Sequence, residues 1–160
     1  MNYDGGPTKE FRVAPIMNGT VIDHIACGQA LNVLKILGVN ENNIYSSISV
    51  GMHVSSKSLE GWKDIIKIED MELDAITAQK IALVAPDATI SIIRNLNVSE
   101  KYKVNLGEKI VGLAKCNNPN CITNKGEPVS SEFTVVSKYP MQLKCCYCNK
   151  TLMNIPDNLL

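Results

Sequence analysis

The chain has 160 residues, and its 16 basic residues are balanced by 16 acidic ones, so the formal net charge is zero. A balanced charge without a lysine or arginine block argues against a protein whose main task is to neutralise a nucleic-acid backbone. No apolar run approaches the roughly 20 residues that span a bilayer, and the N-terminus lacks the layout of a secretory signal. We therefore expect a cytoplasmic protein with reduced thiols and no membrane partner.

The N-terminal third begins with a polar segment and continues into a strand and a helix. Residues 1–10 are polar and contain glycine and proline, which predicts a flexible tail. Residues Phe11–Ile16 alternate between apolar and mixed positions and predict a first strand, in which Pro15 indicates an edge or a bulge. The apolar spacing from Ala30 to Leu37 predicts an amphipathic helix that ends at Gly38.

Four further strands and a second helix are predicted before residue 105. Alternation with a period of two predicts strands over residues 48–54, 62–69, 89–94 and 98–104. The second helix has Asp74 as its candidate N-cap and ends at Pro86. This order predicts an α+β class, namely a ferredoxin-like split βαβ sandwich with an extra strand. Both helices would cover one face of the sheet and leave the other free for a ligand or a second copy.

The last third of the chain is expected to be a separate unit. Residues 105–109 predict a hinge between a first domain at 11–104 and a second at 110–160. Strands are predicted in the second domain at residues 110–115, 133–136 and 141–144. A unit of about 50 residues gains little from a hydrophobic core alone, so we expect a small antiparallel, zinc-ribbon-like β domain held by a metal.

Four cysteines of the second unit have the spacing of a tetrathiolate metal site. Cys116 and Cys121 form a C-x4-C pair, and Cys145 and Cys148 form a C-x2-C pair. Each pair can deliver two thiolates to one tetrahedral Zn²⁺ ion, whereas two disulfides are the less favoured alternative in a chain without a secretory signal. Four thiolates fill the coordination sphere, so the sequence predicts one structural zinc ion per chain.

The remaining cysteines and the histidines give little sign of catalysis. Cys146 is interpreted as a spare thiol and Cys27 as a small packed hydrophobic residue. Asp23 and His24 are adjacent, but successive residues of an extended chain point in different directions, and nothing supplies a nucleophile. No catalytic motif surrounds them. We therefore expect a protein that is not an enzyme.

Three lysines on the predicted sheet suggest a binding function. Lys63 and Lys67 share one face of a predicted strand, and Lys101 lies on another strand. A sheet could bring them together beside aliphatic side chains and so bind the phosphates and the base of a nucleotide. A solvated lysine face is the alternative that these residues alone leave open.

Five short stretches resemble one known family. They are GTVIDHI at 19–25, KDIIKIE at 63–69, APDAT at 85–89, NPNCI at 118–122 and EPVSS at 127–131. From about residue 11 to residue 155, the chain resembles the regulatory chain of aspartate carbamoyltransferase, an enzyme of pyrimidine biosynthesis. The resemblance implies a non-catalytic subunit with an allosteric nucleotide-binding domain and a zinc domain, and it places the zinc ligands on the same four cysteines.

The resemblance also implies partners and a binding site. Regulatory chains of the family form homodimers, dock on catalytic chains through the zinc domain, and bind CTP or ATP, with UTP assisting CTP. Matched position by position, the implied nucleotide site comprises Val13, Ile16, Asp23, His24, Ile65, Lys67, Ser91, Ile93, Val98 and Lys101. Val13 and Ile16 would meet the base through their backbone. Lys67 would approach the ribose and base, and Lys101 the phosphates.

Three positions of the site region depart from the family pattern. Ala14, Ser91 and Leu96 stand where a well-known member carries more polar or aromatic residues, which leaves the effector preference open. The rival interpretations are a zinc-ribbon nucleic-acid-binding protein, a metalloenzyme or thiol redox protein that uses Cys146, and a zinc-stabilised scaffold.

Overall fold

The computed structural model describes residues 15–56 and 61–160. The predicted tail at 1–10 and residues 11–14 of the predicted first strand lie outside the described residues. The same holds for Val13 and Ala14 of the implied nucleotide site.

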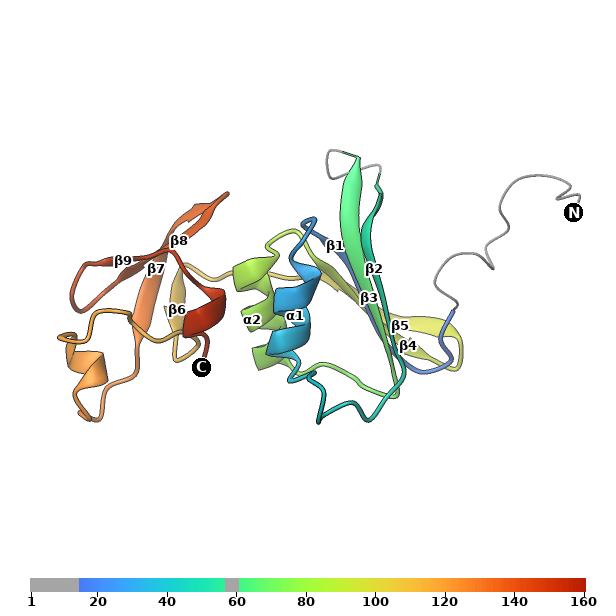
Figure 1. The fold of residues 1–160 in the computed structure, drawn as a ribbon, viewed down its shortest axis with the longest axis horizontal. Helices are drawn as coiled ribbons and strands as arrows, with labels where there is room; N and C mark the ends of the chain where they lie inside the picture. The colour runs from blue at the N-terminus through green and yellow to red at the C-terminus, as the bar shows by residue number, and fades with distance from the viewer. Residues whose placement is uncertain (1–14, 57–60) are drawn as a thin grey trace, which may run out of the picture.

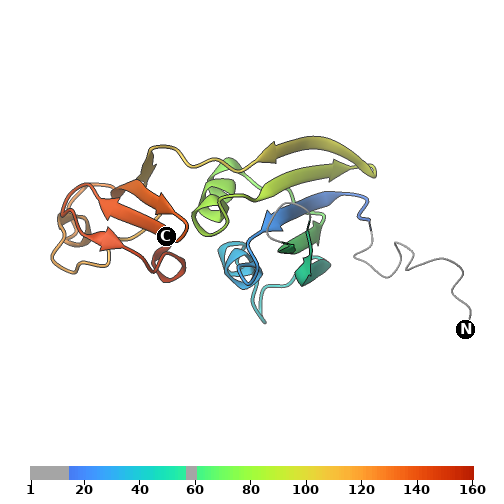
Figure 2. The same cartoon turned by 90° about the horizontal axis from the view of Figure 1, so that it is seen from above.

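Five strands form one antiparallel sheet in the order β2-β3-β1-β4-β5. The strands are β1 (Gly19–Ile25), β2 (Ile48–Ser55), β3 (Trp62–Glu69), β4 (Thr89–Arg94) and β5 (Asn97–Lys103). Two helices, α1 (Ala30–Ile36) and α2 (Ala75–Val84), cover the same face of this sheet (Figures 1 and 2). The predicted ferredoxin-like sandwich is confirmed, and β5 is the extra strand at the β4 edge.

The central strand β1 was missed by the sequence prediction, which expected the first strand at residues 11–16. Pro15 and Ile16 lie outside any strand, and the first described strand begins at Gly19. Thr20 and Ile22 of β1 are buried in alternation, but the pairing with β3 shifts between Ile22 and Ile25. This β-bulge breaks the period of two, which explains why the pattern was not recognised.

Aliphatic side chains from the strands and the helices form the core of the sandwich. The fully or almost fully buried members of this core include Ile22, Ile25, Ile66, Ile68, Ile81 and Ile90. Burying each such side chain stabilises the fold by about 1.5–3 kcal/mol. The predicted N-cap is confirmed, because the Asp74 carboxylate accepts a hydrogen bond from the Thr77 backbone N–H at 2.7 Å. Helix α2 ends at Val84, before Pro86 as predicted.

The C-terminal part contains a second antiparallel sheet in the order β6-β7-β8-β9. Its strands are β6 (Lys109–Val111), β7 (Glu132–Lys138), β8 (Met141–Cys145) and β9 (Thr151–Leu152). Two short 3-10 helices, η2 (Ile122–Asn124) and η3 (Pro156–Asn158), flank it. The predicted strand at 110–115 is wrong beyond Val111, because Gly112 adopts a left-handed conformation with φ 71° and turns the chain.

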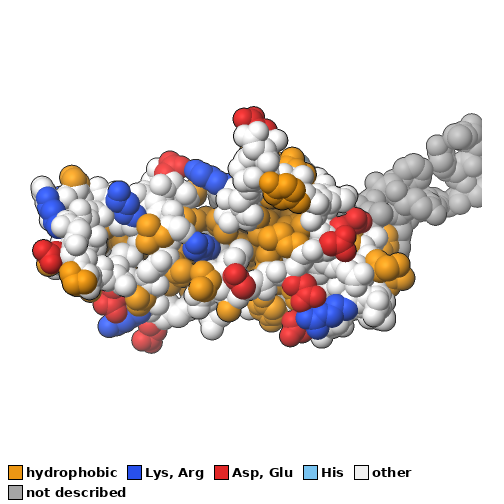
Figure 3. Space-filling model, turned by 90° about the horizontal axis from the view of Figure 1, so that it is seen from below, with side chains coloured by type: hydrophobic (Ala, Val, Ile, Leu, Met, Phe, Trp, Pro, Cys, Tyr) orange, Lys and Arg blue, Asp and Glu red, His pale blue; other side chains and the backbone are white. Residues whose placement is uncertain are grey.

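The surface carries mixed charges. On the face seen in Figure 3, lysine and arginine side chains stand apart from one another and acidic side chains lie among them, while hydrophobic side chains gather across the middle. This face therefore lacks a contiguous basic surface of the kind that binds nucleic acid. Within residues 15–56 and 61–160, no helix is long and apolar enough to cross a bilayer.

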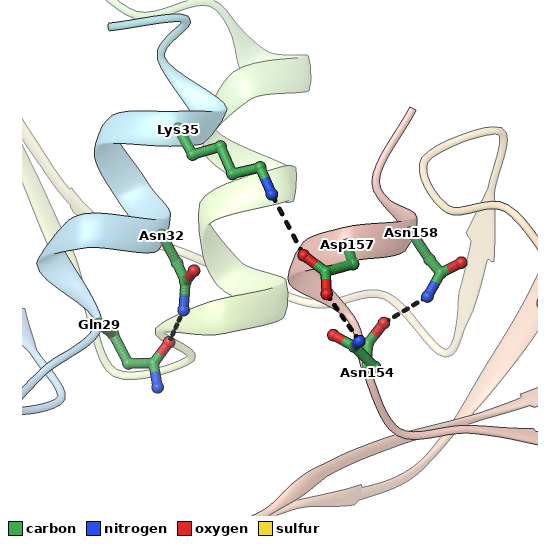
Figure 4. A network of polar contacts seen from close by, with 6 residues as sticks. All are labelled: Gln29, Asn32, Lys35, Asn154, Asp157 and Asn158. Atoms are coloured by element: carbon green, nitrogen blue, oxygen red, sulfur yellow. Dashed lines mark hydrogen bonds and ion pairs between the residues drawn. The ribbon is translucent and has the colours of Figure 1, made fainter. Parts of the chain in front are cut away.

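The two helices lie between the two sheets, as Figure 1 shows, and so contact both parts of the protein. Leu83 of α2 is fully buried in the C-terminal core, while Leu106 and Leu159 pack against both cores. Lys35 of α1 forms an ion pair with Asp157 of η3 at 3.2 Å (Figure 4). An exposed pair of this kind adds about 0–1 kcal/mol, so the shared leucines contribute most to the junction.

Two further polar contacts join the parts. The Tyr139 hydroxyl lies 2.7 and 2.8 Å from the two carboxylate oxygens of Asp87. The Lys80 ammonium donates to the backbone oxygen of Leu160 at the end of the chain. The open face of the five-stranded sheet points away from this junction (Figure 2).

Candidate nucleotide face and metal centre

A row of aligned residues crosses the open face of the five-stranded sheet. Val21 of β1 pairs with Lys67 of β3 on one side and with Ser91 of β4 on the other. Lys67 in turn pairs with Ser49 of β2, and Ser91 pairs with Lys101 of β5. Directly paired residues point to the same side of a sheet, so Lys67 and Lys101 frame Val21 and Ser91. Three strand spacings separate the two lysines by about 14 Å.

A carboxylate lies near two ammonium groups at one end of this row. Asp23 forms an ion pair with Lys63 at 2.8 Å, and the two side chains are 28% and 18% exposed. Burial lowers the pKa of Lys67, an effect that the nearby Asp23 carboxylate partly opposes. The folded chain therefore holds a partly desolvated lysine whose charge an anionic ligand would stabilise.

The bulge in β1 changes where His24 points. His24 adopts a left-handed conformation with φ 56°, and its backbone N–H donates to Asp23 Oδ1 at 2.6 Å. Its ring Nδ1 lies 3.2 Å from Oγ1 of Thr89, which is paired with Asp23 across β1 and β4. The side chains of Asp23 and His24 therefore both reach the open face of the sheet. The expectation that their side chains point in different directions is wrong, because an extended chain alternates only where no bulge interrupts it.

The apolar members of the implied site surround the row. Ile65 is half-buried, and Ile93 is buried although it belongs to the open face. Val98 is exposed and pairs directly with Ile93. Ile16 is buried, and its side chain lies against Gly19. The fold thus brings the members of the implied site that lie on β1, β3, β4 and β5 to one face, whereas Val13 lies outside the described residues.

Asp64 is a structural residue that the sequence interpretation missed. Its side chain is fully buried, and its Oδ2 atom accepts hydrogen bonds from the backbone N–H groups of Gly28 and Ala30 at 2.8 and 3.0 Å. Its Oδ1 atom accepts a third bond, from the His53 N–H at 2.9 Å. The sequence did contain a sign of this role, because Asp64 occupies the same side of the alternating strand as the apolar residues Ile66 and Ile68. Asp64 fixes the turn that follows Asp23 and His24.

The four predicted metal ligands converge on one point. The Sγ atoms of Cys116, Cys121, Cys145 and Cys148 all lie within 4.8 Å of one another. Two of the Sγ pairs are separated by 3.6 and 3.7 Å. These values match the edge of about 3.8 Å of a tetrahedron whose centre is a Zn²⁺ ion 2.3 Å from each sulfur. The geometry is consistent with one structural zinc ion per chain.

The thiols of the cluster differ in pKa. Burial raises the pKa of Cys116 to about 12. Burial also acts to raise the pKa of Cys148, but hydrogen bonds from the Lys150 backbone and the Asn118 side chain outweigh it and lower the value to about 6. A cluster of this kind holds four thiolates together only when a cation neutralises them.

Neighbouring polar groups orient the knuckles. The Thr123 hydroxyl donates to Cys121 Sγ at 3.1 Å, and the Asn124 side-chain amide donates to the backbone oxygens of Cys116 and Asn118 at 2.8 Å each. Such outer contacts fix the direction of metal ligands. The sequence interpretation did not single them out, since only the fold of η2 brings Thr123 to a sulfur and Asn124 to the backbone of the first knuckle.

All six cysteines lie in the described part of the chain, and each is a free thiol. The disulfide alternative is therefore contradicted by the structure. Cys146 is exposed and stands outside the four-sulfur cluster, as predicted. The prediction for Cys27 is wrong, because its thiol is exposed and not packed in the core. It lies in the turn before α1, where the chain leaves the sheet.

Comparisons with known proteins agree with this architecture. Residues 11–105 match the family model "Aspartate carbamoyltransferase regulatory chain, allosteric domain", and residues 108–155 match the "metal binding domain" of the same chain. A relative from Thermoplasma volcanium is 51% identical over 144 residues, which are 90% of this chain and 93% of that protein. A relative from Methanococcoides burtonii is 47% identical over 162 residues and all of both chains. A third relative, from Pyrococcus horikoshii, is 49% identical over 143 residues, which are 89% of this chain and 93% of that protein. All three are described as aspartate carbamoyltransferase regulatory chains.

Proposed function

Because the chain belongs to the aspartate carbamoyltransferase regulatory chain family, and is thus a regulatory, non-catalytic chain, we propose that its open sheet face binds nucleotide effectors of the CTP and ATP type, with UTP as a further candidate. The observation that carries this proposal is the row in which Lys67 and Lys101 frame Val21 and Ser91. The separation of about 14 Å between the two lysines suits a nucleoside triphosphate that lies across the strands.

The polarity of the face supports one orientation of the proposed ligand. Lys101 lies on the exposed edge strand β5 and has room for the charged phosphates. Lys67 is partly buried beside Asp23, a place that suits the ribose and the polar edge of a base. Ile65 and Ile93 supply apolar contacts. Small side chains at Val21 and Ser91 leave the floor between the lysines open to a flat ligand.

The zinc-binding part is proposed to dock on catalytic chains of aspartate carbamoyltransferase, and the nucleotide-binding part to form the regulatory homodimer. The sandwich at 11–104, the hinge at 105–109 and the zinc unit at 110–160 are the proposed divisions. The balanced charge and the scattered basic side chains favour a protein that does not bind nucleic acid. Free thiols support a reducing, cytoplasmic location.

Coupling between the two sites is proposed to run through the helix layer. The effector face and the zinc unit lie on opposite sides of the helices (Figure 1). Leu83 of α2 is buried in the C-terminal core, so a displacement of the sheet that moves α2 also moves that core. An effector shifts the equilibrium of the assembly by its differential affinity for two states, commonly about 1–3 kcal/mol.

Isothermal calorimetry with CTP and ATP on the zinc-loaded full chain tests the binding site. Loss of a charged hydrogen bond of about 1.5–3 kcal/mol predicts that Lys101→Ala weakens binding by about 10- to 150-fold. Lys144→Ala, which removes an exposed lysine from β8, should leave the affinity unchanged. Equal affinity of Lys101→Ala and the wild type would remove the proposed phosphate site.

A second experiment tests the partner. The chain is mixed with catalytic chains of an aspartate carbamoyltransferase, and activity is measured with and without CTP. A complex whose activity responds to CTP supports the proposal. A chain that forms no complex, while still loaded with zinc, contradicts the docking role.

A further inference from the structure

A cysteine and a histidine form a close pair away from the nucleotide face and the metal centre. Cys27 lies in the turn between β1 and α1, and its Sγ atom is 3.2 Å from Nδ1 of His53 at the bulge of β2. The imidazole of His53 stacks on Trp62, the first residue of β3, with ring centroids 4.1 Å apart and planes inclined by 10°. Cys27 and His53 are exposed, and Trp62 is 49% exposed.

A buried group fixes both partners of this pair. The Asp64 carboxylate accepts a hydrogen bond from the His53 backbone N–H and another from the N–H of Gly28, the neighbour of Cys27. The bulge that carries His53 adopts a left-handed conformation with φ 55°. Trp62 then holds the plane of the imidazole. A thiol in contact with a base that is itself oriented by further groups is the arrangement that activates a nucleophile.

We propose that Cys27 is a nucleophilic thiol with His53 as its base, and that it is a site of reversible modification by low-molecular-weight disulfides. In the tautomer that carries its proton on Nε2, His53 Nδ1 accepts the thiol proton. The Cys27 sulfur then attacks one sulfur of the disulfide. The new S–S bond joins Cys27 to half of the reagent, and the other half leaves as a thiolate. A second small thiol reverses the reaction.

Cys146 offers an internal comparison. Its thiol is also exposed, but in the described ranges no imidazole lies within hydrogen-bond distance of it. The four ligand cysteines are tied to the metal when zinc is bound. Cys27 and Cys146 are thus the two thiols open to a reagent in the zinc-loaded chain, and they differ in the presence of a base.

The test treats the zinc-loaded full chain with oxidised glutathione and follows each cysteine by peptide mass spectrometry. Because a positioned base supplies up to several powers of ten in rate, we expect Cys27 to react at least about tenfold faster than Cys146. His53→Asn should bring the rate of Cys27 to within about threefold of Cys146, since that variant retains no base. Asparagine tolerates the left-handed backbone at this position.

The control is Asp70→Asn, an exchange at another exposed residue with a left-handed backbone, which should leave the rate of Cys27 unchanged. Local unfolding in His53→Asn would leave the thiol accessible and would not slow its reaction, so a fall in rate reports the loss of the base. Equal rates for Cys27 and Cys146 in the wild type overturn the proposal. So does a rate of Cys27 that His53→Asn does not lower.

Discussion

Replacing Asp64 should destabilise the N-terminal half more than any change at an exposed acidic residue. The carboxylate is fully buried and accepts three backbone hydrogen bonds, from Gly28, Ala30 and His53. In Asp64→Ala, the N–H of Ala30 loses its acceptor in a fully buried position, while those of Gly28 and His53 belong to exposed residues that water can reach. One buried N–H without an acceptor and two hydrogen bonds replaced by water together lower the free energy of unfolding by about 2–5 kcal/mol.

Asp64→Asn is expected to be milder. An asparagine can direct its single side-chain oxygen at Gly28 and Ala30 and so retain two of the three hydrogen bonds. Its amide group then faces the His53 N–H, a donor against a donor. Loss of one bond and this repulsion amount to about 1–3 kcal/mol. The predicted order of stability is therefore wild type, then Asp64→Asn, then Asp64→Ala.

Urea denaturation of the zinc-loaded chain provides the assay, with the fluorescence of Trp62 as the probe. Trp62 is the single tryptophan of the chain and lies two residues from Asp64 on β3, so it reports the N-terminal half. Asp70→Asn is the matched control, because Asp70 is exposed and its left-handed backbone suits asparagine. Its effect should stay within about 0.5 kcal/mol. A cost below about 1 kcal/mol for Asp64→Ala would refute the assigned role.

Three further predictions concern the metal centre and the sheet face. Thr123→Val removes the hydrogen bond to Cys121 Sγ and should weaken zinc binding by about 10- to 100-fold in chelator competition. Lys67→Met should weaken nucleotide binding at least tenfold, as for a lost charged hydrogen bond of about 1.5 kcal/mol. Because burial lowers the pKa of Lys67 below 10.5, the wild type gains stability as pH rises toward that value, and the variant should lack this gain in urea titrations. Removing zinc should unfold the C-terminal unit, as measured by circular dichroism, and lower the urea midpoint of the N-terminal half, because Leu83 loses its cover.

Each of these predictions has its own control. Thr123→Ser keeps the hydroxyl and should retain most of the zinc affinity. Lys144→Met removes an exposed lysine and should change neither nucleotide binding nor the pH profile. An unchanged midpoint of the N-terminal half after zinc removal would show that the halves are independent, although Leu83 of α2 is buried in the C-terminal core.

Local patterns of the sequence predicted most of the elements. Alternation of residue types located β2, β3, β4 and the greater part of β5, although the pairing of β2 with β3 shifts between Gly51 and Val54. Apolar spacing located α1. The helix start at Asp74 followed from side-chain chemistry that acts over three residues. Strand β1 was missed because the bulge after Ile22 interrupts its period.

The proposed nucleotide face shows the limit of local reasoning. The family likeness assigned Asp23, His24, Lys67 and Lys101 to one site, but it could not give their alignment, which depends on the pairing register of four strands. Nor could it bring His24 to the side of Asp23, since that requires the left-handed bulge. Asp64 had no visible role, because its three partners come from two other segments of the chain.

The sequence by itself determined the metal chemistry of this protein, its family and its class of fold. Cysteine spacing and apolar periodicity involve residues that are close in the sequence, so they can be recognised without knowledge of the fold. Only the tertiary structure decided that α1 and α2 lie between the two sheets and that Leu83 belongs to the C-terminal core. It also decided that Cys27 meets His53, residues 26 positions apart, at the surface. These contacts join segments distant in sequence, and they form because each sheet and helix must cover its apolar face with another element.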